Sequence, residues 1–259
     1  MRWTWWLAVA VIALMSIVAS APARLVWGPL ARTEPALHLS GFHGTLWRGS
    51  IEELRWRDLG PATLHWRVRY LPLAVGRLTV DGVLEAPWGE AGVFWQRRTG
   101  SDSSWQIDSL RVDLERVPWI GLGVPFRLKG HVSTDREFFI AGDAAVPHDA
   151  RGTMAWRGAG VTAPLGVDLG DVTATPQESN SAGIRWRITN RGGDLAIAGL
   201  FSIAREGRYQ FSATLTPRAT GSEELRQMLD WMLAKNGDAG NVGEYRLEFA
   251  GRLGGAGSR

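Results

Sequence analysis

The sequence predicts a mostly β protein: an N-terminal transmembrane helix, then an antiparallel β-sheet-rich domain of two degenerate repeats, with one short amphipathic helix near the C-terminus. Three observations predict this fold. The N-terminal segment is uncharged and apolar, apolar residues recur at every second position through most of the remaining chain, and several segments recur in the same order. The composition agrees, because 32 Gly and 14 Trp in 259 residues favour short strands joined by tight turns.

The first element is an expected membrane anchor over residues 1–27. Residues 3–23 carry no charge and lie between Arg2 and Arg24. About 20 helical residues cross a hydrocarbon core of roughly 30 Å, so one span fits. Tryptophan side chains favour the headgroup layers. The expected membrane-interface anchors are Trp3, Trp5, Trp6 and Trp27.

A cleaved signal peptide is the alternative, because Ala21-Pro22-Ala23 has the spacing of small residues at cleavage sites. The apolar segment is longer than the roughly 7–15 residues of a signal-peptide core, which favours the retained anchor. A short N-terminal tail before a large domain favours a cytoplasmic N-terminus. We therefore expect a single-pass protein with most of its chain outside the cytoplasm.

Strands follow the anchor. In residues 63–70 the apolar side chains Leu64, Trp66, Val68 and Tyr70 alternate with polar ones. The same alternation occurs in residues 76–86, 110–115, 124–132, 208–215 and 244–253. Period-two alternation is typical of antiparallel sheet with one face on a core and one in solvent. Whether the strands form one continuous sheet or two packed sheets stays open.

The one predicted helix of the soluble part lies near residues 222–236. Its apolar residues fall at helical spacing: Leu225, Met228, Leu229, Met232 and Leu233. Ser222 or Thr220 can cap its start, and Gly237 suits its end. We expect this helix to close one end of the sheet core rather than to bind a partner or lie on a membrane.

A repeated motif divides the soluble part in two. GTLWRG at 44–49 returns as GTMAWRG at 152–158, and the pairs LHWRV with IRWRI and GRLTVDGVLEA with GDLAIAGLFSI follow in the same order. This predicts a duplication, with one β-rich repeat over 28–148 and a second over 149–259. Its expected core residues are Trp47, Trp66, Trp156 and Trp186. Neighbouring strand residues point to opposite faces, so each Trp-Arg pair, including the one at Trp56, is expected to bury its ring and expose its guanidinium.

No pattern of residues predicts a reaction. Without cysteine there is no thiolate nucleophile or cysteine-based metal site, and the five histidines show no metal-ligand spacing. Asp81, Asp113 and Asp168 are explained as polar-face residues of strands. The prediction is a protein that is not an enzyme, without catalytic residues, metal or cofactors. Alternation separates arginines from aromatic rings, so nucleic-acid binding is not expected either.

The chain resembles protein N of the bacterial type II secretion pathway. The resemblance rests on the anchor, LSGFHGTLWRGS, LHWRVRYLPLAVGRLTVDG, GGDLAIAG, YQFSATLTP before the helix, and EYRLEFAGRL, and it covers almost the whole chain. It implies a single-pass inner-membrane accessory protein with a periplasmic domain, acting in export of folded proteins across the outer membrane. Its implied partners are other inner-membrane or secretin components of that apparatus.

A looser similarity to AsmA-like envelope proteins implies an alternative function. In that alternative the sheet is a periplasmic lipid-handling module, and lipid is a further expected partner. The small amount of predicted helix, which leaves a broad apolar sheet face to cover, motivates it. Sheet packed on sheet would explain the same composition.

Overall fold

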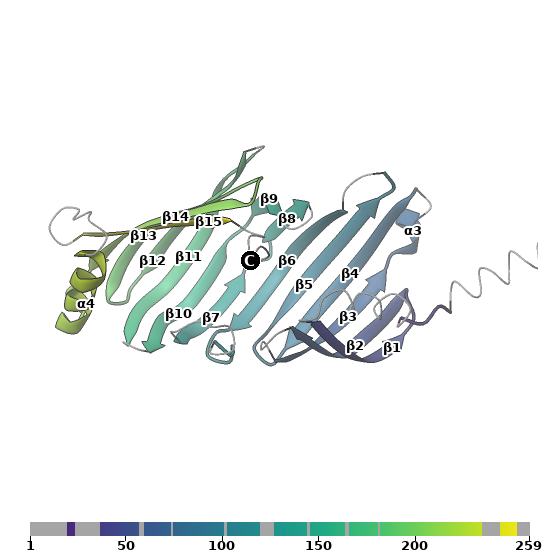
Figure 1. Ribbon diagram of the computed structural model, residues 1–259, viewed down its shortest axis with the longest axis horizontal. Coiled ribbons are helices and arrows are strands. Elements are labelled where there is room, and N and C mark those ends of the chain that lie inside the picture. Colours follow the sequence, from purple (N-terminus) through teal and green to yellow (C-terminus); the bar gives the residue numbers. More distant parts are fainter. Residues whose placement is uncertain are drawn as a thin grey trace, which may run out of the picture.

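A computed structural model describes residues 20–23, 37–56, 60–73, 75–100, 103–119, 127–143, 146–163, 166–180, 182–234 and 244–252. Within these residues fifteen strands form one antiparallel sheet (Figure 1). The strands of the first part are β1 (Leu37–Gly44), β2 (Arg48–Trp56), β3 (Pro61–Val68), β4 (Arg77–Ala86), β5 (Gly89–Arg98), β6 (Ser103–Asp113), β7 (Arg127–Thr134), β8 (Phe139–Asp143) and β9 (Val146–Arg151). Those of the second part are β10 (Met154–Ala163), β11 (Val167–Asn180), β12 (Gly183–Arg191), β13 (Leu195–Ala204), β14 (Arg208–Pro217) and β15 (Tyr245–Arg252).

The strands lie side by side in chain order, from β1 to β7 and then from β10 to β15. Figure 1 shows β1 and α3 (Tyr70–Leu73) at one end of the sheet and α4 (Glu223–Ala234) at the other. The prediction of a mostly antiparallel β protein with little helix is confirmed. The question of one sheet or two is answered as well, because the main path crosses directly from β7 to β10.

The strand register gives the sheet one apolar and one polar face. Paired residues lie on the same face of a sheet, and successive residues lie on opposite faces. Starting from Trp66, the pairs Trp66↔Gly82, Val80↔Trp95 and Trp95↔Trp105 carry the apolar face across β3 to β6. In the second part, Trp186↔Phe201 and Phe201↔Phe211 carry it across β12 to β14. The period-two pattern of the sequence therefore predicted the correct face of the sheet for these strand side chains.

Glycine makes room for the large rings on the apolar face. Trp66 lies opposite Gly49 of β2, and a Cβ at Gly49 would come within 2.6 Å of the Trp66 ring and 2.3 Å of the His43 carbonyl oxygen. Gly44 has a φ of +81°, and a Cβ there would lie 2.4 Å from the Arg48 carbonyl oxygen. Both ends of the GTLWRG motif therefore need glycine for the β1–β2 turn to close.

The sheet branches at β6. Residues 104–107 of β6 pair with β8, whereas residues 111–113 pair with β7. The β8–β9 hairpin thereby leaves the main path, and Phe138, which directly precedes β8, and Ala150 of β9 pack against Ile184, Trp186 and Ile203 of the apolar face. The hairpin covers part of this face in the second half of the sheet.

Two further clusters cover the ends of the apolar face. At one end, Ala23 packs with Ile51, Trp66 and Val68. At the other end, Leu225 and Leu229 of α4, each 2% exposed, pack with Val167 and Leu195. The Ser222 hydroxyl accepts a hydrogen bond from the Leu225 N–H at 3.2 Å, as expected of an N-cap. The amphipathic helix therefore closes one end of the sheet core, as predicted.

Most of the predicted anchor lies outside the described residues, together with Trp3, Trp5, Trp6 and Trp27. Within the part of the chain that is described, no helix is both long and apolar enough to cross a membrane. Residues 20–23 are described, and Pro22 forms a β-bridge with Thr45.

Two expectations about single side chains were wrong. Trp56 is 48% exposed, because it is the last residue of β2 and lies opposite the first residue of the edge strand β1. Tyr70 was expected to share the face of Trp66, but β3 ends at Val68 and Tyr70 begins α3 with 63% of its surface exposed. Pro72 has no N–H to donate to a ladder, so a strand could not run on through the α3 segment.

The proposed duplication stays a prediction. Its boundary between residues 148 and 149 falls inside β9. The segments LHWRV and IRWRI form β3 and β12, and the segments that follow them form β4 and β13. The GTLWRG motif runs from the end of β1 into β2, which is next to β3, whereas GTMAWRG leads into β10, which is separated from β12 by β11.

Candidate interaction surfaces

The tryptophans of the repeated motif are structural elements of the apolar face. Trp66 and Trp186 are 5% and 7% exposed, whereas Trp47 and Trp156 are half-buried. The Trp66 indole N–H donates to the Leu46 carbonyl oxygen at 3.1 Å, and that of Trp156 donates to the Lys129 carbonyl oxygen at 2.8 Å. The structure brings Trp47 and Trp66 into one cluster and places Trp186 in another. Because the indole N–H groups of Trp66 and Trp156 already donate to backbone carbonyls, these rings hold strands together and have no N–H free to bind a ligand.

Ionisable side chains lie mostly on the exposed polar face, in pairs rather than in clusters. Three histidines face carboxylates: His43 with Glu52 at 3.1 Å, His131 with Asp113 at 3.7 Å, and His148 with Asp143 at 3.4 Å. Among the described residues no three His, Asp or Glu side chains gather as metal ligands would. Asp81 forms a two-point ion pair with Arg69, and Asp168 accepts the Gly170 N–H, so both have structural roles.

The pKa shifts follow from these exposed pairs. Hydrogen bonds from Ser40 and Arg55 lower the pKa of Glu53, and Arg208 lowers the pKa of Glu206. The hydrogen bond from Tyr245 to Asp230, at 2.6 Å, raises the pKa of Tyr245. Neighbours in open solvent cause each of these shifts, unlike the desolvated shifts that mark an acid or base in a cleft.

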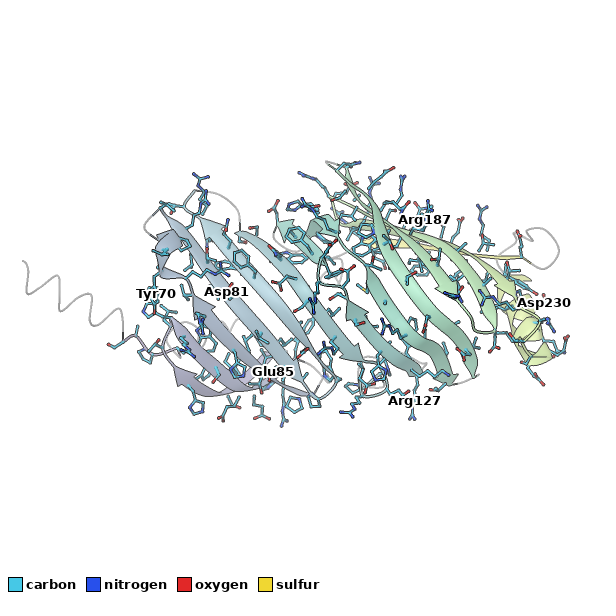
Figure 2. The ribbon with its side chains drawn as sticks, turned by 180° about the vertical axis from the view of Figure 1, so that it is seen from behind. Tyr70, Asp81, Glu85, Arg127, Arg187 and Asp230 are labelled. Atoms are coloured by element: carbon cyan, nitrogen blue, oxygen red, sulfur yellow. The ribbon has the colours of Figure 1, made fainter. Side chains whose placement is uncertain are left out.

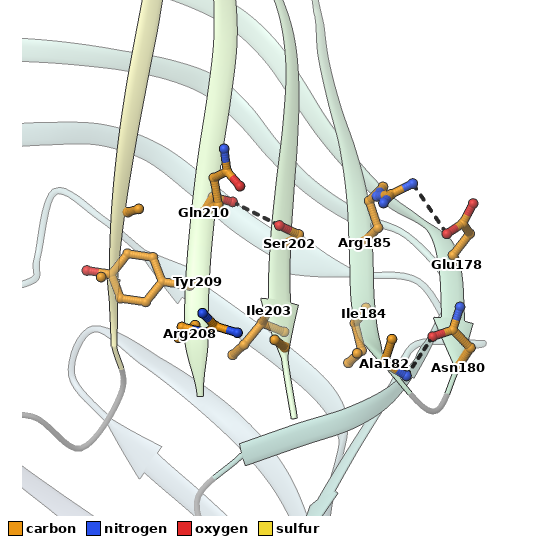
Figure 3. A pocket seen from close by; sticks show the side chains of 14 residues that line it. Glu178, Asn180, Ala182, Ile184, Arg185, Ser202, Ile203, Arg208, Tyr209 and Gln210 are labelled. Carbon is orange, nitrogen blue, oxygen red and sulfur yellow. Dashed lines mark hydrogen bonds and ion pairs between the residues drawn. The ribbon is translucent and has the colours of Figure 1, made fainter. Parts of the chain in front are cut away.

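Two open hollows lie on the second half of the sheet. The first, of about 540 Å³, is lined by strand ends that include Ile184, Arg185, Ser202 and Tyr209 (Figure 3). The second, of about 470 Å³, lies between Arg187 of β12 and Arg246 of β15. Small side chains on β13 and β14 separate these arginines: Ala198, Ser212 and Thr214. The hollows arise from small residues between long ones, and the Arg185–Glu178 ion pair in the first, at 3.3 Å, is exposed to solvent on both sides.

The two edge strands of the main path, β1 and β15, differ in regularity. β1 is interrupted at Gly41, whose φ is +67°, and it ends at Gly44 with a positive φ. β15 pairs with β14 in unbroken register over all eight residues. Its Phe249 stacks on Phe211 with ring centroids 4.7 Å apart and is 50% exposed. Within the described residues, β15 therefore presents a regular edge without proline or bulge, which is the kind of edge that accepts an added strand.

The middle of the apolar face is a second candidate surface. Val93, Trp95 and Trp105 of β5 and β6 lie on this face, outside the three clusters that cover it elsewhere. Each is only half-buried. A half-buried strip of large apolar side chains on a sheet is suited to a partner surface or to acyl chains.

Sequence reasoning missed one exposed apolar segment. Tyr70, Leu71 and Leu73 of α3, together with Val75 and Leu78 just after it, are all exposed. The run YLPLAV carries no polar residue and breaks the period-two alternation before it, and this was the signal available in the sequence. Figure 2 shows Tyr70 near Asp81 at the end of the sheet opposite Asp230 of α4.

Comparison with known proteins gives a consistent family. A family profile described as "Type II secretion system (T2SS), protein N" matches residues 35–247. Type II secretion system protein N of Vibrio cholerae is 27% identical, covering 93% of this chain and 95% of its own length. The proteins of the same name from Pectobacterium carotovorum and Klebsiella pneumoniae are 29% and 24% identical, and each alignment covers at least 92% of both chains. No solved structure matches significantly. The chain belongs to the family of type II secretion system protein N.

Proposed function

We propose that this protein is an accessory inner-membrane component of the type II secretion apparatus that acts by protein–protein interaction in the export of folded proteins across the outer membrane. The observation that carries the proposal is the family match over residues 35–247, with relatives aligned over nearly their full length. The structure supports a binding role, since its conspicuous surfaces are a sheet edge and an apolar face rather than a cleft with reactive groups.

The proposed placement is a single pass through the inner membrane with a cytoplasmic N-terminus and a periplasmic sheet. The uncharged segment over residues 3–23 supports it, because residues 3–20, ahead of the sheet contacts of Ala21 to Ala23, are by themselves long enough for one span. Confinement to a membrane raises the effective concentration of the sheet near other membrane components. Weak contacts along one strand edge then give more complex than they would between freely diffusing proteins.

The proposed docking surface is the β15 edge. Strand addition provides affinity through main-chain hydrogen bonds, while alternate side chains provide specificity. On β15 the residues Arg246 and Glu248 lie on the polar face, whereas Leu247 and Phe249 lie on the apolar face. An incoming strand would therefore meet both a charged row and an apolar row. The proposed partners are other inner-membrane or secretin components of the apparatus.

In-cell photocrosslinking tests this function. A photoreactive phenylalanine analogue at Phe249 probes the edge, and the same analogue at Val83, which is 43% exposed on the interior strand β4, is the matched control. We expect crosslinks to a secretion component from position 249 and none from position 83. No such crosslink from position 249 or from its neighbour Leu247, in cells that are exporting protein, would refute docking at this edge.

A second candidate function is lipid handling in the manner of AsmA-like proteins. The half-buried strip formed by Val93, Trp95 and Trp105 favours it. Native mass spectrometry of the purified full-length chain would detect bound lipid. Val93→Glu, on the strip, is expected to abolish lipid retention, whereas Val83→Glu, on the polar face of the neighbouring strand, is not. A wild-type chain that carries no lipid would exclude this function.

A further inference from the structure

The large apolar side chains that the structure describes as exposed concentrate in one short segment. Of the nine large hydrophobic side chains that are exposed in the described chain, five lie between residues 70 and 78. Leu71 is 90% exposed and Val75 is 68% exposed. We call this set the rim patch: Tyr70, Leu71, Leu73, Val75 and Leu78. Single exposed apolar residues are ordinary on protein surfaces, but a contiguous group marks a site of contact.

The rim patch is held in place by backbone hydrogen bonds. The Val75 N–H donates to the Pro72 carbonyl at 3.1 Å, and the Gly76 N–H donates to the Leu73 carbonyl at 3.0 Å. The Thr99 N–H and hydroxyl both donate to the Gly76 carbonyl at 3.0 Å, which joins the segment to the β5–β6 turn. The apolar side chains are therefore presented on a fixed support.

The rim patch lies on the same rim of the sheet as residues 20–23. The register pairs Arg48 with Arg67 and Arg77 with Arg98, so the β1–β2 turn and the α3 segment lie at the same ends of their strands. At the β1–β2 turn, the Leu46 N–H donates to the Ala21 carbonyl at 2.8 Å. The Trp47 and Tyr70 rings then join that turn to the rim patch, with centroids 5.5 Å apart. The last residues of the uncharged N-terminal segment, residues 20–23, thus lie beside the patch.

Positive charge surrounds the rim patch. Residues 67–81 and 95–100 contain one acidic residue, Asp81, which pairs with Arg69. The same two stretches contain five arginines: Arg67, Arg69, Arg77, Arg97 and Arg98. Apolar side chains bordered by arginine are typical of surfaces that enter the headgroup layer of an anionic membrane.

We propose that the rim patch inserts into the headgroup layer of the membrane that holds the N-terminal segment, with the surrounding arginines on anionic headgroups. This inference rests on the membrane placement proposed above. It also gives the sheet an orientation. In strands β1 to β6, the strand ends that carry the β1–β2 turn, the α3 segment and the β5–β6 turn face the bilayer. The anchor and the rim patch together then fix the sheet against rotation at the membrane surface.

Fluorescence quenching in vesicles tests the proposal. The chain contains no cysteine, so Leu71→Cys allows a single environment-sensitive label on the patch. Leu200→Cys is the matched control, because Leu200 is also an exposed leucine, 43% exposed on β13. The full-length protein is reconstituted in vesicles of phosphatidylethanolamine and phosphatidylglycerol. Quenching is measured with iodide in the water and with a nitroxide on the lipid headgroup, and flotation of the same vesicles reports attachment.

We expect the label at position 71 to be quenched severalfold more by the headgroup nitroxide than the label at position 200, and severalfold less by iodide. If the protein floats with the vesicles but iodide quenches the label at position 71 as strongly as the control label, the rim proposal is wrong, whereas the proposed membrane anchor is unaffected. A label shielded from both quenchers would also overturn it, because protein would then cover the patch. Protein that fails to float would refute both the placement and the rim contact.

A charge variant tests the role of the arginines. Arg77→Gln with Arg97→Gln, in the Leu71→Cys background, is expected to reduce nitroxide quenching in phosphatidylglycerol-containing vesicles. In vesicles of phosphatidylcholine alone, the variant and its parent are expected to give equal quenching, because no anionic headgroup is present. Equal quenching in the anionic vesicles would contradict the headgroup contact of these arginines.

Discussion

Replacing Gly49 by alanine should destabilise the first half of the sheet, although alanine normally stabilises a strand relative to glycine. The lower conformational entropy of alanine favours folding by about 0.5–1 kcal/mol. At position 49 the added Cβ would lie 2.3 Å from the His43 carbonyl oxygen and 2.6 Å from the Trp66 ring. Overpacking of this kind costs about 1–3 kcal/mol, so the repulsion exceeds the gain. We expect a net loss of about 1–2 kcal/mol.

Gly82→Ala is the matched control for Gly49→Ala. Gly82 flanks Trp66 from the other side, on β4, and its added Cβ would find its nearest neighbour at 3.6 Å, which is ordinary contact. Thermal unfolding of the detergent-solubilised chain, followed by tryptophan fluorescence, should show a Tm about 2–8 °C lower for Gly49→Ala. Gly82→Ala should leave Tm unchanged or raise it. Equal stability of the two variants would refute the reasoning that Gly49 makes room for the Trp66 ring.

Three further predictions concern the second half of the sheet. Leu229→Ala should weaken the packing of α4 on the sheet by about 2–5 kcal/mol, because Leu229 is one of the two buried side chains described for this helix. Hydrogen exchange should therefore become faster in α4 selectively. Unchanged exchange in α4 would contradict this role. The pKa of Tyr245 is raised by its hydrogen bond to Asp230, so this bond stabilises the fold below the ordinary tyrosine pKa and is lost as pH rises through the raised one. Absorbance titration of the three tyrosines should therefore show one late step that Asp230→Asn moves to lower pH, and an unmoved step would contradict the pairing. Gly152→Ala should lower Tm, since position 152 has a φ of +75° and its Cβ would lie 2.5 Å from the Phe138 Cα; an unchanged Tm would show that the β9–β10 turn relaxes.

The strands and α4 could be predicted because their signals are local. Period-two alternation marks β3, β4, β14 and β15, and the Leu225–Leu229 spacing marks the buried stripe of α4. The face of each strand follows from the same alternation once the neighbouring strands are paired. These elements depend on the order of residues within about ten positions.

The branch at β6 and the exposed α3 segment depend on more distant contacts. Nothing within β6 indicates that residues 104–107 and 111–113 take different partners. That choice follows from the packing of Phe138 and Ala150 on Trp186, some 36 to 48 residues away in the chain. The rim patch was visible as an apolar run, but only the fold places it beside residues 20–23.

The central claim, that this open sheet serves export by binding other components, is tested most directly by secretion itself. A strain that lacks this protein, but retains the rest of the apparatus, is assayed for folded exoprotein in the medium and complemented with wild type or with Leu247→Asp, a change on the β15 edge. The account predicts that the deletion retains exoprotein inside the cell, that wild type restores export, and that Leu247→Asp restores it poorly while accumulating normally. Undiminished export by the deletion strain would contradict the account.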